Sequence, residues 1–272
     1  MSDARKINFL INWSNVPCLD DFCVMPLIFH FGDFYMQFRS FTIALSLASV
    51  ATFSQAKPIW QDFSVTGLYG ENYELTKAPE QSTVTFEYAA KLQYGDIFAF
   101  ADRTESDGQK ETYFEFSPRL SLGAVTGTKL EYGMIKDVLV ATTWEGGEGF
   151  NNYLYGFGVD LAIPYFQYFQ ANIYRVNNEN IDDDWQLTFA YGLPFSFGKQ
   201  DFLFDGFMDW STKEDTHASE MNWTSQLKWN AGKYISPETR LYLGIEYSLW
   251  NNKYGVSNAD ENNVSALVKY HF

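Results

Sequence analysis

The stretch VSALVKYHF, residues 264–272, alternates between apolar and polar side chains. In an extended chain every second side chain lies on the same side. One side of this stretch therefore carries Val264, Ala266, Val268, Tyr270 and Phe272. The other side carries Ser265, Lys269 and His271. The alternation predicts a β-strand with one apolar face, which could belong to a membrane barrel or to a soluble β-sandwich.

The composition favours the membrane barrel. Aromatic residues make up 19% of the chain and hydrophobic residues 46%, yet the mean hydropathy is only -0.26. A membrane-spanning helix needs about 20 consecutive apolar residues, and no such run occurs after residue 56. Strands with lipid on one face and water on the other would explain this combination. A final strand that ends in Phe272 is also typical of bacterial outer-membrane barrels.

Residues 57–272 contain about twelve alternating segments, each near the roughly 10 residues that a tilted membrane strand requires. The predicted strands are 59–70, 82–91, 94–103, 111–122, 132–145, 151–163, 166–176, 184–195, 200–211, 220–231, 239–250 and 262–272. Polar stretches predict exposed loops at 71–81, 103–111, 176–184, 211–220 and 251–263. The connections between them are shorter. We therefore predict an all-β transmembrane antiparallel barrel, with long loops at one end and the C-terminus on the periplasmic side.

The segment MQFRSFTIALSLASVATFSQA, residues 36–56, has the features of a secretory signal peptide. Arg39 supplies a positive start, residues 41–53 are apolar, and Ser54-Gln55-Ala56 forms a small-x-small cleavage site. We therefore predict that residues 1–35 are a spurious extension and that Met36 is the initiator. Because both cysteines lie in residues 1–35, residues 57–272 are predicted to have no disulfide and no Cys-based metal site.

The charge and the motifs argue against several functions. The net charge of -15 makes the chain a poor candidate for nucleic-acid binding. His217 lies near Ser219 in a polar stretch, but proximity within a loop is not a catalytic geometry. We find no G-x-S-x-G elbow, phosphate-binding loop or cluster of His and Cys. We expect a protein that is not an enzyme and that needs no cofactor or metal.

Two predicted strands mix carboxylates with aromatic rings on one side. In YGDIFAFAD this side carries Tyr94, Asp96, Phe98, Phe100 and Asp102. In LFDGFMDW it carries Asp205, Phe207 and Asp209. Charged groups belong in a wet interior, so the rings beside them would face inward as well. Rings that stack on a base and polar groups that bind hydroxyls could bind a nucleoside. Alternatively, the rings only fill a small barrel.

Further inward side chains are predicted on other strands. Glu115 and Arg119 share a side with Ser117 and Ser121, and Arg119 could pair with Glu115 or with an acid on a neighbouring strand. Pro118 would then face lipid and implies a bulge or a strand end. The remaining inward candidates are Asp137, Asp160, Lys228, Glu246 and Lys269. Their mixed signs predict a transverse field across the lumen.

The block YFEFSPRLSLGAVTGTKLEYGMIKDVLVAT, residues 113–142, resembles the Tsx nucleoside-specific channels and their OmpK relatives. The resemblance depends on E-x-x-P-R-x-S from Glu115 to Ser121 and on T-G-x-x-L-x-x-G from Thr126 to Gly133. Weaker similarity covers essentially all of 57–272. The resemblance implies a twelve-stranded monomeric barrel with a narrow lumen that passes nucleosides.

Two functions follow. The first is passive uptake of nucleosides or similar small solutes through the lumen. The alternative, suggested by the OmpK relatives, is a surface-interaction barrel whose loops meet phage or host, with little selective transport. The other partners expected are outer-membrane lipid and, for the strand that ends at Phe272, the barrel-assembly machinery.

Overall fold

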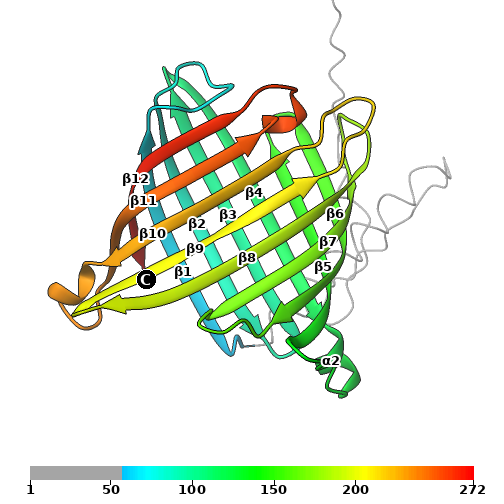
Figure 1. The fold of residues 1–272 in the computed structure, drawn as a ribbon, viewed down its shortest axis with the longest axis vertical. Coiled ribbons are helices and arrows are strands. Elements are labelled where there is room, and N and C mark those ends of the chain that lie inside the picture. The colour runs from blue at the N-terminus through cyan, green and yellow to red at the C-terminus, as the bar shows by residue number, and fades with distance from the viewer. Residues whose placement is uncertain (1–56) are drawn as a thin grey trace, which may run out of the picture. The chain divides into compact units, whose positions relative to one another are not determined.

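Residues 57–272 form twelve antiparallel strands that close into a barrel in the computed structural model (Figure 1). Each strand pairs with its neighbours in sequence, and β1 closes the barrel against β12. The strands are β1 (Trp60–Gly70), β2 (Gln81–Leu92), β3 (Gly95–Ser106), β4 (Gln109–Ser121), β5 (Ile135–Gly147), β6 (Phe150–Leu161), β7 (Tyr168–Asn177), β8 (Asp184–Phe197), β9 (Gln200–Ser211), β10 (Met221–Asn230), β11 (Arg240–Asn251) and β12 (Glu261–His271). The barrel prediction is confirmed.

The structure describes residues 57–272. The predicted extension, signal peptide and cysteines lie outside them. Three short helical segments interrupt the connections: α2 (Leu122–Thr126), η1 (Gly232–Tyr234) and η2 (Lys253–Gly255). Within the described range, no helix is both long and apolar enough to cross a membrane.

Strand β12 has the two faces that its alternation predicts. Val264 and Val268 lie on the outer face, where 53% and 51% of their surface is exposed. The alternate residues of β12 are buried, and among them Lys269 contacts Glu87 of β2. Because β1 lies between β2 and β12 in the sheet, this contact passes over the inner face of β1. The polar face of β12 is therefore the inner face.

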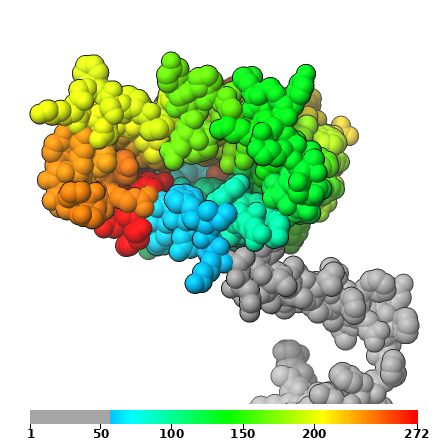
Figure 2. All heavy atoms as spheres, turned by 90° about the horizontal axis from the view of Figure 1, so that it is seen from below, coloured from blue at the N-terminus to red at the C-terminus, as the bar shows by residue number. Residues whose placement is uncertain are grey.

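The two ends of the barrel differ in their connections. The loop end carries residues 71–80, 178–183, 212–220 and 252–260. The terminal end carries the start of β1 and the end of β12. Figure 2 shows a hollow between the two long sides of the barrel in the view from below. Long connections are not confined to the loop end, because residues 122–134, which include α2, join β4 to β5 at the terminal end.

The predicted loop at 103–111 is wrong. Strands β3 and β4 continue through most of it and are joined by Asp107 and Gly108 alone. Both residues have positive φ, 45° and 78°, as a tight hairpin turn between twisted strands requires. The Asp-Gly pair was the local signal for this turn, and the surrounding polar residues obscured it.

Pro118 produces neither the predicted bulge nor a strand end. It lies inside β4 opposite Ile97 of β3. On the other side, the ladder between β4 and β5 is interrupted at residues 117 and 118 and resumes in the same register at Arg119. Thr142 of β5 donates a hydrogen bond to the carbonyl oxygen of Pro118 at 3.0 Å. This contact bridges the gap that the missing N–H of proline leaves.

Candidate functional site on the inner face of the barrel

The predicted site residues of β3, β4 and β9 share faces as their spacing indicated. Asp96, Phe98, Phe100 and Asp102 alternate along β3. Their register partners on β4 are Arg119, Ser117, Glu115 and Tyr113. Asp205, Phe207 and Asp209 alternate along β9. Tyr94 lies in the turn between β2 and β3, and 49% of its surface is exposed.

Arg119 joins four strands through one side chain. Its Nε and Nη2 donate to the two carboxylate oxygens of Asp96 on β3, at 2.8 and 2.9 Å. Nη2 also donates to Asp160 on β6 at 2.9 Å, and Nη1 donates to Asn172 on β7 at 3.4 Å. Of the two partners predicted for Arg119, the structure contains the acid on a neighbouring strand and not Glu115.

A glycine makes room for this cluster. Gly158 is the register partner of Asn172 on the adjacent strand. A Cβ atom at Gly158 would lie 2.1 Å from the Oδ1 atom of Asn172. A side chain at this position would therefore displace the acceptor that Arg119 uses.

The basic side chains of β10 and β12 are also paired nearby. Lys228 is fully buried and donates to Asp205 on the neighbouring strand at 2.6 Å. Lys269 pairs with Glu87, two strands away. Each of these basic groups therefore lies directly against a carboxylate. The transverse field that the mixed signs predicted stays a prediction.

Four aromatic rings form a row along β3, β4 and β6. The ring centroids of Phe98 and Phe100 are 6.0 Å apart, and those of Phe100 and Tyr113 are 5.7 Å apart. Tyr113 stacks on Phe150 at 6.2 Å with an interplanar angle of 26°. We call Phe98, Phe100, Tyr113 and Phe150 the aromatic row. Phe207 lies on β9 and is not part of this row.

Carboxylates accompany the aromatic row. The hydroxyl of Tyr113 donates to Glu115 at 2.7 Å. Glu145 is the register partner of Glu115 on β5, and Asp102 is that of Tyr113 on β3. Ion pairs within 4 Å involve none of these three acids in the part of the chain that the structure describes. The row therefore combines flat rings with acceptors for hydrogen bonds.

Sequence reasoning missed three members of this arrangement. Tyr113 alternates with Glu115, so its face could have been assigned from that spacing. Phe150 follows the Glu148-Gly149 turn directly and had no alternation before it to assign its face. Glu145 stands near the end of β5, where two glycines follow it and weaken the pattern.

The rest of the inner face is partly filled. Ala141, Leu154, Tyr174 and Val176 form a buried apolar cluster on β5, β6 and β7. This cluster narrows the lumen on that side. Within residues 57–272, no group of three or more His, Cys, Asp and Glu could hold a metal ion.

The two histidines within residues 57–272 are held in polar surroundings of their own. His217 lies in the loop 212–220, with Nε2 3.6 Å from a carboxylate oxygen of Asp184. The Nδ1 of His271 lies 2.6 Å from a carboxylate oxygen of Asp62 on β1. Ser219, the serine near His217, donates to the backbone oxygen of Ser211 at 2.6 Å. Its hydroxyl is therefore directed to the backbone and not to the histidine.

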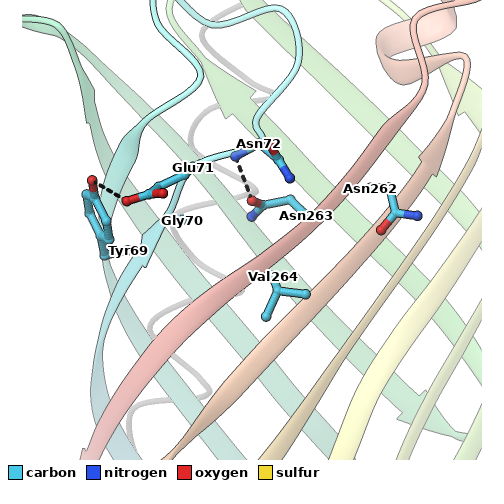
Figure 3. A pocket seen from close by; sticks show the side chains of 7 residues that line it. All are labelled: Tyr69, Gly70, Glu71, Asn72, Asn262, Asn263 and Val264. Atoms are coloured by element: carbon cyan, nitrogen blue, oxygen red, sulfur yellow. Dashed lines mark hydrogen bonds between the residues drawn. The ribbon is translucent and has the colours of Figure 1, made fainter.

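A groove of about 360 Å³ lies at the loop end of the junction between β1 and β12 (Figure 3). It is lined by Tyr69, Gly70, Glu71, Asn72, Asn262, Asn263 and Val264. The groove marks where strand pairing stops, since β1 ends at Gly70 opposite Ser265 while β12 begins four residues earlier, at Glu261. It lies at the edge of the barrel, separate from the aromatic row.

Comparison with known proteins gives one family match. The model of the family described as "Nucleoside-specific channel-forming protein, Tsx" matches residues 60–272. Two relatives are named outer membrane protein OmpK, both from Vibrio parahaemolyticus. The first is 24% identical over 165 residues, which cover 56% of this chain and 63% of the relative, less than two thirds of its length. The second, of serotype O3:K6, is 24% identical over 223 residues, which cover 74% of this chain and 81% of the relative.

Two solved structures are similar to this chain at low sequence identity. The KdgM porin has a TM-score of 0.48 and 8% identity, covering 77% of this chain and 99% of that chain. The outer membrane protein Omp33 of Acinetobacter baumannii has a TM-score of 0.41 and 10% identity, covering 79% of this chain and 100% of that chain.

Proposed function

Because the chain belongs to the family of nucleoside-specific channel-forming proteins, Tsx, and lies in the Gram-negative outer membrane, we propose that it is a channel there and that it passes nucleosides by passive diffusion. Substrates would move along the aromatic row. The loop end would face the medium and the terminal end the periplasm.

The observation that carries this proposal is the aromatic row with carboxylates beside it. A base can stack on an aromatic ring whatever its identity, and each such contact contributes about 1–3 kcal/mol. The hydroxyl groups of ribose can donate to the oxygens of Asp102 and Glu115. Several such contacts along the row would each bind the solute weakly, so that the solute can enter the channel and also leave it.

Single-channel conductance of the refolded barrel tests the proposal. Adenosine and thymidine should block the current in a saturable way, and ribose should not. Phe100→Ala should weaken the block roughly ten-fold, because a stacking contact of about 1.4 kcal/mol corresponds to that factor. Phe116→Ala is the matched control, since Phe116 lies on the outer face of the adjacent strand.

The outcomes separate three cases. Nucleoside block that Phe100→Ala weakens and Phe116→Ala preserves supports the row as the substrate path. Steady current without block in the unmodified barrel contradicts nucleoside selectivity and leaves a general small-solute channel. Block that is equal in all three proteins places the binding site elsewhere in the lumen.

The alternative function lies in the loops. Under it, exchanging residues 71–81 and 211–220 for loops of another barrel abolishes phage adsorption. Nucleoside flux would stay intact in the same protein if the lumen carries transport. Measuring both properties on one exchange variant therefore separates the two functions.

A further inference from the structure

The loop 71–80 turns inward over the mouth of the barrel. The N–H of Asn72 donates to the Oδ1 of Asn263 at 3.0 Å (Figure 3). The hydroxyls of Tyr73 and Ser265 are 2.8 Å apart, and the N–H of Glu74 donates to Glu261 at 2.9 Å. The three partners are inner-face residues of β12, the strand next to β1, so the start of the loop lies on the inner side of the barrel wall.

A buried ion pair anchors this loop. Lys253 of η2 pairs with Glu261, and only 4% and 2% of their side chains are exposed. The ammonium group of Lys253 lies 4.9 Å from the ring centroid of Trp250, 5.3 Å from that of Tyr254 and 5.8 Å from that of Tyr73. Aromatic faces and a carboxylate together compensate a buried ammonium group.

Glu261 joins three segments through one carboxylate. It accepts from Glu74 of the loop 71–80, from the hydroxyl of Ser248 on β11 at 3.1 Å, and from Lys253. Removal of the lysine would leave this carboxylate buried without its counter-charge, a state that the protein can avoid by letting water in or by protonating the acid.

The other loops continue the layer. Gly255 accepts from the N–H of Ala218 at 2.9 Å, which ties the segment 252–260 to the loop 212–220. Asp182 donates through its N–H to Thr216 at 2.8 Å, which adds the loop 178–183. At the other side, the N–H of Ala78 donates to Ser106 of β3 at 2.9 Å. We call these four connected loops the mouth layer.

We propose that the mouth layer sets the largest solute that can enter the channel, and that the Lys253–Glu261 pair holds it in the closed arrangement. The aromatic row then selects among solutes that the mouth layer has already limited by size. The inference depends on the channel function but not on the nucleoside preference.

Liposome swelling with glucose, sucrose and raffinose as probes tests it. Lys253→Met should raise the swelling rate with raffinose several-fold relative to that with glucose. Lys129→Met is the control, because Lys129 is an exposed lysine of the connection 122–134 at the terminal end, outside the mouth layer. Heat-modifiable mobility on a gel shows for each variant that the barrel is folded.

Two more variants separate charge burial from packing. The double variant Lys253→Met with Glu261→Gln buries no net charge and keeps a carbonyl acceptor for Glu74, so it should return the raffinose-to-glucose ratio toward that of the unmodified protein. Tyr73→Ala removes a side chain of the mouth layer without unpairing a charge and should raise the ratio.

The inference is overturned if Lys253→Met and Tyr73→Ala leave the ratio unchanged in folded barrels, since the pair then only braces the wall. If Lys253→Met does not fold, Tyr73→Ala decides by itself. The sugars carry no base, so these results stand apart from the nucleoside-block experiment, and either proposal can fail alone.

Discussion

Arg119 shows how far one side chain can be placed from sequence. Its inward direction follows from alternation with Glu115, and an acid on a neighbouring strand was one of the partners expected. Asp160 and Asn172, however, lie more than 40 residues away along the chain. Only the closed sheet brings them within reach, so no local pattern could have identified them.

Arg119→Met should lower the free energy of unfolding of the barrel by about 3 kcal/mol, because it leaves the part-buried Asp160 without a counter-charge and leaves Asp96 with only Lys91 as a basic partner. Urea titration of the barrel in detergent, followed by heat-modifiable mobility, measures the loss. Arg103→Met is the control: this arginine is half exposed and 3.9 Å from Glu148, so its removal should cost no more than about 1 kcal/mol. An equal loss of unfolding free energy in the two variants would contradict a stabilising role of Arg119 in the barrel.

The aromatic row is a property of several elements together. Phe98 and Phe100 share a face by alternation within β3, which the sequence alone predicts. Tyr113 joins them because the Asp107-Gly108 turn fixes the register of β3 against β4. Phe150 of β6 joins the row because the Glu148-Gly149 turn fixes the register of β6 against β5, and β5 in turn pairs with β4. Each step beyond one strand needed a register between strands, which the predicted strand ranges and the predicted loop at 103–111 did not give.

The loop 212–220 should dock less firmly as the pH rises. Burial raises the pKa of Glu220 from 4.5 to about 7, and the carboxyl groups of Asp184 and Asp209 act in the same direction, whereas the N–H of Gly255 and His217 oppose it. The docked loop therefore favours the protonated acid. The stability that Glu220 contributes is complete below about pH 4.5 and is lost as the pH rises through about 7.

Hydrogen exchange of the backbone amides of 212–220 across this pH range measures the effect, after correction for the intrinsic pH dependence of exchange. Glu220→Gln should remove the pH dependence, because an amide stays neutral and still accepts from Gly255. Asp215→Asn, at an exposed carboxyl group of the same loop, should leave the dependence as it is. A pH dependence that survives Glu220→Gln would assign it to another group.

At the scale of the whole molecule, acidic residues outnumber basic ones. The chain carries a net charge of -15, and the basic groups Arg119, Lys228 and Lys269 of the inner face are each tied to carboxylates. Asp102, Glu115 and Glu145 keep no basic partner within the described residues. We therefore expect a lumen that disfavours anions.

The reversal potential in a KCl gradient should accordingly show a preference for potassium over chloride. The variant with both Glu115→Gln and Glu145→Gln should reduce that preference, because it removes two inner-face acids without removing their hydrogen-bonding groups. Glu148→Gln, an exposed acid in the turn next to β5, is the control. A preference for chloride in the unmodified barrel would contradict the charge argument.

The sequence by itself determined the strands and their faces. No predicted strand bound differs from the observed one by more than three residues. Side-chain alternation is a property of the extended chain, so it survives in any fold that contains the strand. The tertiary structure alone decided the partners of Arg119, the completion of the aromatic row by Tyr113 and Phe150, and the folding of the loops over β12. These contacts depend on how the strands are staggered when the sheet closes, which is a property of the whole barrel and not of any segment.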